Sequence, residues 1–187
     1  MSSIINPALS PWDIIQDWIT LEVTMDEFDI DFTMGDYNEL SLDLMLISSS
    51  QEDSPLGGIV VSFQVDESVI NGYAQFTAIE GEIVNAVSGG TQFASLIGSL
   101  SYRNNLTQEF YTTANLLLKS GNGIAPTFVQ YTTNYTNFDS PDFLAGIQWG
   151  VMWTDQLITN LNKIRVSVGD GVSFAGFSAY RLLGRKI

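Results

Sequence analysis

The sequence predicts an all-β protein, folded as an antiparallel β-sandwich of jelly-roll-like form with about ten short strands. Apolar and polar side chains alternate over many short stretches, as from Leu40 to Leu46. Such alternation is typical of strands with one buried face and one wet face. Turn-forming residues separate the stretches, as in the polar loop from Ser48 to Gly58. A chain of 187 residues, 45% of them hydrophobic, is long enough for one domain with a sizeable core.

The N-terminal residues differ from the rest, and we divide the chain into an N-terminal arm at 1–18 and a β-sandwich domain at 19–187. Ser10 and Pro11 are typical of a helix start, as the N-cap and a first-turn residue. The apolar residues that follow at helical spacing are Trp12, Ile15 and Ile19. Two interpretations stay open at this point: a short helix that caps the sandwich, or an anchoring arm that packs on another subunit.

Strands with an alternating pattern are predicted from residue 19 onward. In chain order they cover 19–25, 28–34, 40–46, 59–65, 73–79, 82–87, 97–102, 110–119, 127–135 and 147–154. A short helix would also fit the spacing of Phe93, Leu96, Ile97 and Leu100. We favour a strand at 97–102 because this segment alternates and its neighbours are strands. A loop is expected from Asn137 to Pro141.

The C-terminal segment 158–184 is predicted to be a β-hairpin. Branched and aromatic residues alternate on either side of Gly169-Asp170-Gly171, and an Asp-Gly pair at such a position favours a tight hairpin turn. An isolated hairpin would barely be stable in water. We therefore expect this hairpin to be inserted into a sheet, where it closes the fold.

The net charge of −14 is unevenly distributed along the chain. Residues 1–100 hold most of the 21 carboxylates and no lysine or arginine. The basic residues near the C-terminus are Lys163, Arg165, Arg181, Arg185 and Lys186. Such a chain is expected to repel nucleic acid, because phosphate binding requires clustered cations. Two interpretations of the acidic half stay open: it docks on the basic hairpin of a neighbouring subunit, or it only keeps the protein soluble.

Cysteine and histidine are both absent. Their absence excludes disulfides and thiolate nucleophiles, and it removes the commonest general base and metal ligand. The stretch from Asp29 to Gly35 has the alternating carboxylates of a calcium loop, but Met34 and Leu40 stand where such loops place glycine and an acidic residue. A solvated strand is the favoured interpretation there. We expect no enzymatic activity, no cofactor and no metal.

The aromatic residues allow a second class of function. The 4 tryptophans and 7 tyrosines could stack on sugars, as in carbohydrate-binding β-sandwiches. Most of them lie in predicted strands, so packing in the core is the favoured interpretation. A glycan-binding module would instead expose aromatic side chains on one face of the sandwich.

No targeting or membrane-spanning segment is expected. A secretory signal begins with basic residues, whereas the first basic residue in this chain is Arg103. No apolar run approaches the length that spans a bilayer, so we expect no contact with a membrane.

Three groups of residues follow one another along the chain. The first group is Phe32-Thr33, Tyr37, Leu40, Leu42 and Leu44. The second group is Phe63-Gln64-Val65-Asp66 and Asn71-Gly72-Tyr73. The third group is Trp153, Ile164 to Val168, Gly176-Phe177-Ser178 and Leu182-Leu183-Gly184. In this order the groups resemble the small jelly-roll-like structural proteins of tailed bacteriophage virions, which include tail-fibre-like and capsid decoration proteins.

The resemblance implies a β-sandwich mounted on the exterior of a phage particle, commonly as a homotrimer. The implied function is that of a non-enzymatic decoration or cement protein, made in the host cytoplasm, with itself and the major capsid protein or other virion proteins as partners. The alternative is a short tail-fibre or baseplate component that binds a host glycan receptor through loops such as 48–58. The candidate interaction residues are Trp12, Ile15, Trp18, Arg165, Arg181 and Arg185.

Overall fold

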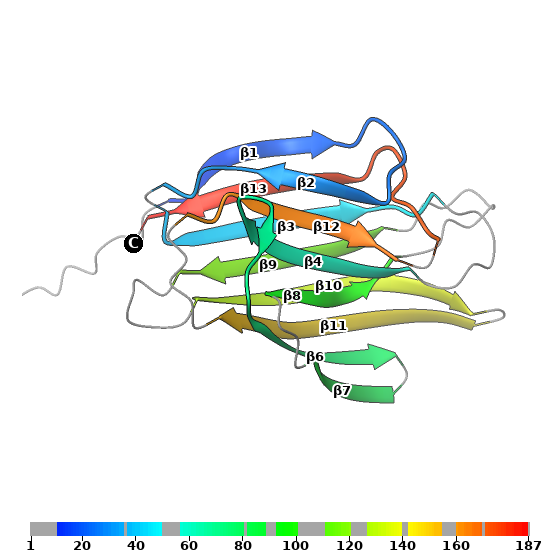
Figure 1. The fold of residues 1–187 in the computed structure, drawn as a ribbon. Coiled ribbons are helices and arrows are strands. Elements are labelled where there is room, and N and C mark those ends of the chain that lie inside the picture. The colour runs from blue at the N-terminus through cyan, green and yellow to red at the C-terminus, as the bar shows by residue number, and fades with distance from the viewer. Residues whose placement is uncertain are drawn as a thin grey trace, which may run out of the picture.

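Two antiparallel β-sheets pack face to face in the computed structural model, which confirms the predicted all-β sandwich (Figure 1). The structure describes residues 11–35, 37–49, 57–80, 82–88, 93–100, 111–120, 127–139, 142–154, 160–169 and 171–186. Within these ranges the chain forms thirteen strands and no helix. The jelly-roll form of the sandwich stays a prediction.

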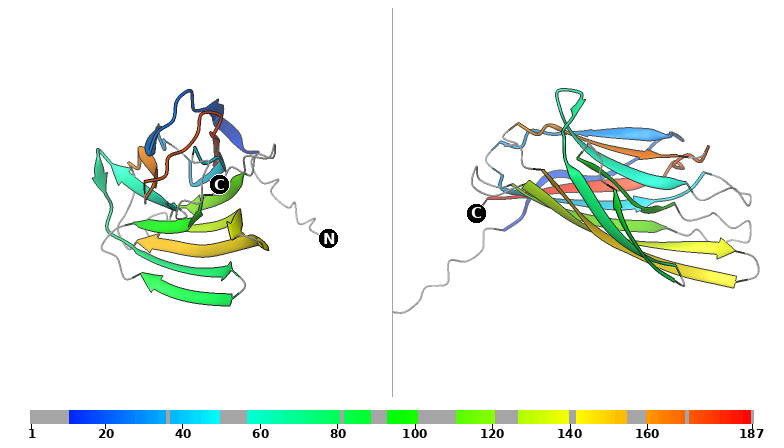
Figure 2. Two further views of the ribbon diagram at one scale, coloured as in Figure 1. Left: turned by 90° about the vertical axis from the view of Figure 1, so that its right-hand side faces the viewer. Right: turned by 60° about the horizontal axis from the view of Figure 1, so that its bottom comes forward.

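The larger sheet has eight strands and spans the molecule from β1 to β7 (Figures 1 and 2). In spatial order its strands are β1 (Asp13–Thr20), β13 (Ala179–Arg185), β3 (Glu39–Leu46), β9 (Thr112–Lys119), β10 (Thr127–Asp139), β11 (Asp142–Thr154), β6 (Tyr73–Glu80) and β7 (Glu82–Ser88). The smaller sheet contains β2 (Glu27–Asp31), β12 (Lys163–Val168), β4 (Gly58–Val65), β5 (Ser68–Val69) and β8 (Ala94–Ser99), and β8 pairs with β4. Each sheet therefore combines strands from distant parts of the chain.

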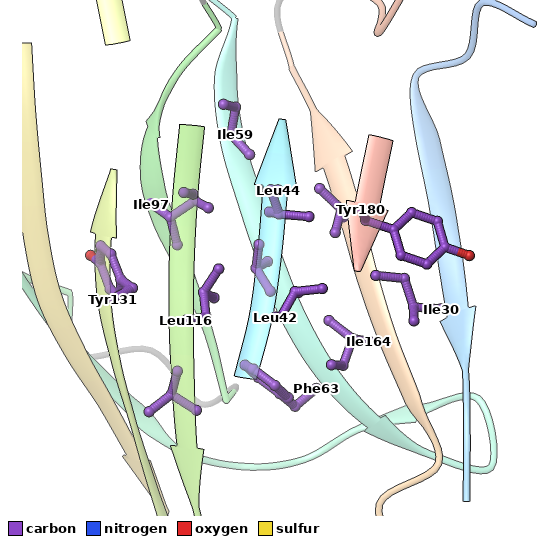
Figure 3. Packing of buried hydrophobic residues seen from close by; sticks show 14 of the residues in the cluster. Ile30, Leu42, Leu44, Ile59, Phe63, Ile97, Leu116, Tyr131, Ile164 and Tyr180 are labelled. Carbon is purple, nitrogen blue, oxygen red and sulfur yellow. The ribbon is translucent and has the colours of Figure 1, made fainter. Parts of the chain in front are cut away.

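The hydrophobic core lies between the two sheets and is built from alternate residues of their strands. Figure 3 shows Leu42 and Leu116 of the larger sheet close to Phe63 and Ile164 of the smaller one. Each of these four side chains is at most 2% exposed. Aromatic contacts also join the sheets, because the ring of Phe28 lies 5.5 Å from that of Tyr180, centroid to centroid. The alternation read from the sequence is thus the alternation of buried and outward side chains in most strands.

Most predicted strands are confirmed close to their expected bounds. β3, β4, β6 and β7 agree to within one residue with the predicted segments 40–46, 59–65, 73–79 and 82–87. The choice of a strand over a helix for the segment 97–102 is also confirmed, although β8 covers Ala94–Ser99 and so begins three residues earlier than predicted. The loop expected from Asn137 to Pro141 is shorter than predicted, because β10 and β11 stay paired as far as Asp139 and Asp142.

The helix predicted near the N-terminus is wrong. Residues Asp13–Thr20 form β1, an edge strand that pairs with β13. Backbone hydrogen bonds to β13 are available only in the folded chain, and they outweigh the local capping signal at Ser10 and Pro11. The proposed division between arm and domain at residue 18 falls inside this strand, and residues 1–10 lie outside the described part of the chain. The strand expected at 19–25 ends at Thr20. Beyond it, Leu21 still donates to Ser178 O at 2.7 Å, and Met25 forms an isolated bridge with Phe174.

The C-terminal hairpin is also wrong, although both of its strands exist. β12 pairs with β2 and β4 in the smaller sheet, whereas β13 pairs with β1 and β3 in the larger sheet. The connection between them crosses from one sheet to the other, and Phe174 within it forms bridges to Met25 and Ser48. Each strand has neighbours on both sides in its own sheet, so the glycines at the turn end one strand without folding the next one back onto it.

The core packing expected for the aromatic residues holds for some of them only. Tyr131 and Tyr180 are buried, at 3% and 7% exposure. Tyr73 and Trp149, by contrast, are 49% and 42% exposed on the outer face of the larger sheet. The prediction was wrong for these two because alternation along a strand separates two faces without saying which face meets the core.

Candidate interaction surface at the N-terminal edge

The outer face of β13 brings Arg181 against a carboxylate and an indole ring. The register of β13 and β3 places Arg181 opposite Asp43, and Nε and Nη2 of the arginine donate to Asp43 Oδ2 at 3.1 and 2.6 Å. The guanidinium carbon lies 5.1 Å from the ring centroid of Trp18 on β1. Asp43 also accepts a 2.7 Å hydrogen bond from Asn115 Nδ2 on β9. Arg181 thereby connects β1, β13 and β3.

Arg185 repeats this arrangement four residues further along β13. Its Nε donates to Glu39 Oε2 at 2.8 Å, and its guanidinium carbon lies 4.7 Å from the ring centroid of Trp12. Glu39 is only 4% exposed, and its other oxygen lies 3.6 Å from Lys119 Nζ on β9. A buried carboxylate requires such partners because water no longer solvates it. Each indole–guanidinium contact at a partly exposed site contributes about 0.5–1 kcal/mol.

Arg165 lies on the outer face of the other sheet, remote from these pairs. The register of β12 and β2 places it opposite Asp29, and its Nε and Nη2 donate to Oδ1 and Oδ2 of that carboxylate at 2.7 and 2.8 Å. This bidentate contact, with further help from Lys163, holds the pKa of Asp29 below its ordinary value. The same contact raises the pKa of the Arg165 guanidinium.

The carboxylates of β2 therefore belong to a solvated strand face, as predicted, with cations of β12 beside them. Lys163 Nζ lies 3.3 Å from Asp29 and 3.7 Å from Asp31, and it also donates to Glu67. Hydrogen bonding to Glu67 is the main reason that the pKa of Lys163 is raised. Among the described residues, no group of three or more acidic side chains is arranged to hold a metal ion.

The acidic first half and the basic C-terminal strands thus meet within one chain. Arg165, Arg181 and Arg185 pair with carboxylates of β2 and β3. These cations therefore have acidic partners within their own chain. Docking between subunits through these charges stays a prediction.

Large apolar side chains gather along β1 and the connection that follows it, and we call this surface the apolar edge. Its members are Ile14, Trp18, Ile19, Val23 and Phe177, with exposed fractions of 64, 47, 40, 60 and 75%. Phe177 joins the group because its backbone N–H donates to Leu21 O at 3.1 Å. Five of the ten exposed large hydrophobic residues in the described part of the chain lie here. Such a concentration is typical of an interaction surface.

The predicted interaction residues contribute to this edge unequally. Trp18 is part of the apolar edge, and Trp12 is half-buried beside Arg185. Ile15 points inward and packs against the core. Sequence reasoning missed Phe177, whose backbone has a φ of 80°. A bulky residue in this left-handed region is strained, and such strain is found more often at functional positions.

The backbone of β1 is also open to pairing on one side, because among the described strands only β13 pairs with it. The pairing of β1 and β13 is interrupted by two register shifts, between Ile14 and Gln16 and between Gln16 and Ile19. Irregular pairing and the charges of Asp13 and Asp17 are features that limit indiscriminate pairing of an edge strand. Recognition at this edge would therefore depend mainly on side chains.

Comparison with protein-family models, curated proteins and solved structures found no match for this chain. The resemblance to phage virion proteins accordingly stays a prediction. No helix in the described ranges is long and apolar enough to cross a membrane.

Proposed function

We propose that the protein is a non-enzymatic structural component of a tailed-phage virion, placed on the capsid exterior as a decoration or cement protein. The single observation that supports this proposal is the apolar edge, where exposed tryptophan, phenylalanine and branched residues are concentrated along β1 and the connection after it, in a chain of net charge −14. Burial of such side chains at an interface is favourable, by about 25 cal/mol for each Å² removed from water.

The proposed partners are the major capsid protein, or another virion protein, and further copies of this chain in a homotrimer. In this arrangement the apolar edge contacts the shell, and the negative surface of the remaining sandwich faces solvent. The strained backbone at Phe177 holds an aromatic ring outward at the edge, where it can enter a pocket of the partner. Synthesis in the host cytoplasm and final placement on the virion surface follow from the same proposal.

The alternative is a short tail-fibre or baseplate component, which differs in the partner that the apolar edge contacts. Both versions require that the edge mediates assembly. The alternative adds a host glycan receptor, bound through loops such as 48–58, and that binding needs a different experiment.

Co-sedimentation with intact particles that lack the endogenous protein tests the proposal. The variant Ile14→Asp/Val23→Asp places two charges in the apolar edge at solvent-exposed positions, and we expect its loading onto particles to fall at least about tenfold. The matched control is Ile147→Asp, which makes the same kind of change at an exposed isoleucine of β11. Failure of the wild type to bind particles, or equal loading of all three proteins, would overturn the proposal.

A further inference from the structure

A second exposed surface lies on the outer face of β6, β10 and β11, several strands away from the apolar edge. We call it the aromatic strip, and its aromatic members are Tyr73, Phe128, Trp149 and Trp153. β10 and β11 run side by side along the sheet, and β6 follows them (Figure 1). The register places Phe128 opposite Trp153 and Trp153 opposite Tyr73, so these three rings belong to one row across the strands.

The orientation of β11 is the reverse of what its sequence favours. Its larger apolar residues, including Ile147 and Trp149, point outward with exposures of 44 and 42%, while Gln148 between them is buried at 3%. Gln148 is satisfied inside the sandwich, since its Nε2 donates to Leu96 O at 2.5 Å. A shift of one residue would bury the apolar side chains and expose the glutamine. The chain instead keeps an aromatic surface in water, which requires a reason other than stability.

The rings of the strip are held in fixed positions. Tyr73 and Trp153 stack on each other with 5.6 Å between ring centroids and 23° between ring planes. Trp149 lies four residues before Trp153 on the same strand, so its ring stands on the same face about 13 Å away. The strip thus presents two aromatic platforms that are separated along an extended strand.

Uncharged polar side chains accompany these rings. Gln130, Thr132 and Asn134 alternate along β10 and are exposed, and Thr132 lies opposite Trp149. Amide and hydroxyl groups both donate and accept hydrogen bonds. Residues 127–138 and 143–154 contain no charged residue at all, in a chain with a net charge of −14.

This combination of groups selects among the classes of ligand. Nucleic acid requires cations, which the two strands lack. A sugar ring has an apolar face that stacks on an aromatic ring and a rim of hydroxyl groups that pair with amides and hydroxyls. A flat, extended surface with separated platforms suits a chain of linked sugars better than a single one.

We propose that the aromatic strip binds an uncharged polysaccharide, with sugar rings stacked on Trp149 and on Tyr73 beside Trp153 and with hydroxyl groups bonded to Gln130 and Thr132. This inference rests on the reversed β11 and on the absence of charged residues from 127–138 and 143–154, and it does not depend on the apolar edge. Polysaccharide binding and particle loading can therefore fail separately.

Affinity gel electrophoresis with soluble polysaccharides tests the inference. The probes are hydroxyethyl cellulose, galactomannan and dextran as uncharged chains, with alginate as an acidic one. We expect at least one uncharged polysaccharide to retard the wild type and alginate to leave its mobility unchanged. Trp149→Ala is expected to weaken the retarding interaction by about tenfold.

The matched control is Trp18→Ala, which removes a tryptophan of similar exposure from β1 and should bind like the wild type. The inference is overturned if no uncharged probe retards the wild type, or if Trp149→Ala and Trp18→Ala bind equally well. It is also overturned if light scattering shows that the wild type is an oligomer and Trp149→Ala a monomer, because the strip would then be an interface between copies of this chain.

Discussion

Two regions of the larger sheet, the charged end at β13 and β3 and the region of β10 and β11, have opposite surface chemistry, although they share one hydrophobic core. On β13 and β3, opposite charges face each other across the strands, as in the pairs of Arg181 with Asp43 and Arg185 with Glu39. On β10 and β11, the facing residues of the segments 127–138 and 143–154 are uncharged, as in Thr132 with Trp149. This difference in surface charge matches a difference in what fixes the register of each pair of strands.

β13 and β3 come from opposite ends of the chain, and Arg181 and Asp43 are 138 residues apart. Opposite charges across two strands contribute about 0.2–1 kcal/mol for each pair and oppose a slipped register. β10 and β11 are consecutive, and their register follows from the short connection between Asp139 and Asp142. Their outward side chains are not needed to align the strands, so they are free to form a binding surface.

The largest expected effect tests whether the charged end belongs to the common core. Leu182 on β13 is fully buried, and Leu182→Asp combines lost burial with a buried carboxylate, a cost of about 5 kcal/mol or more. Because that approaches the whole stability of a typical domain, we expect the variant not to fold. Soluble yield and urea denaturation measure this, with Leu183→Asp on the outer face of the same strand as the control. A cooperatively folded Leu182→Asp protein would show that β13 does not close the core.

A smaller effect is expected when one charge is removed from the charged end. Glu39→Gln leaves Arg185 and Lys119 without their shared carboxylate at a position that is 4% exposed. The free energy of unfolding should fall by about 2 kcal/mol, since a buried pair is broken at one side only. Gln130→Ala in the aromatic strip should change it by less than about 0.5 kcal/mol. Urea denaturation measures both changes. Equal losses of unfolding free energy in the two variants would contradict the distinction between the charged end and the region of β10 and β11.

The smallest effect extends the comparison to the outer face of the smaller sheet. Asp29 has a depressed pKa in the folded protein because Arg165 donates to its carboxylate. Because the pKa of Asp29 is lower in the folded chain, its carboxylate stabilises the fold at pH values above its unfolded-state pKa, about 4. That stability is lost as the pH falls through the folded-state pKa. Between about pH 5 and pH 2 the wild type should therefore lose more unfolding free energy than Asp29→Asn. Parallel pH profiles for the two proteins would show that this ion pair does not act on stability.

Strand positions were largely predictable, whereas strand partners were not. β3 and β4 appear where alternation placed them, because a strand's pattern lies within a few consecutive residues. β12 and β13 were both expected, yet each pairs in a different sheet. The turn residues at Gly169 and Gly171 carry no information about which distant strands have unpaired backbone groups. That information exists only when the whole sheet is assembled.

The candidate surfaces show the same limit. Trp12 and Trp18 were identified from sequence together with Arg181 and Arg185, but their contacts with one another follow from β1 being a strand. Phe177 was not identified, because a single aromatic residue in a glycine-rich turn gives no signal of exposure. The exposure of Trp149 was not predicted, because β11 points its larger apolar residues away from the core. The buried Gln148 beside it donates a hydrogen bond to Leu96 O of β8, a strand distant in sequence.

The sequence by itself determined the β-sandwich, most strand bounds and the acidic character of the molecule, because these depend on composition and on neighbours within a few residues. Only the tertiary structure decided that β1 is a strand, that β12 and β13 lie in opposite sheets and that β11 turns its tryptophans outward. Each of these outcomes depends on contacts with a segment that is distant in sequence. An example is the pairing of Ile19 on β1 with Tyr180 on β13. Such contributions to the free energy arise only when the partner strand is in place.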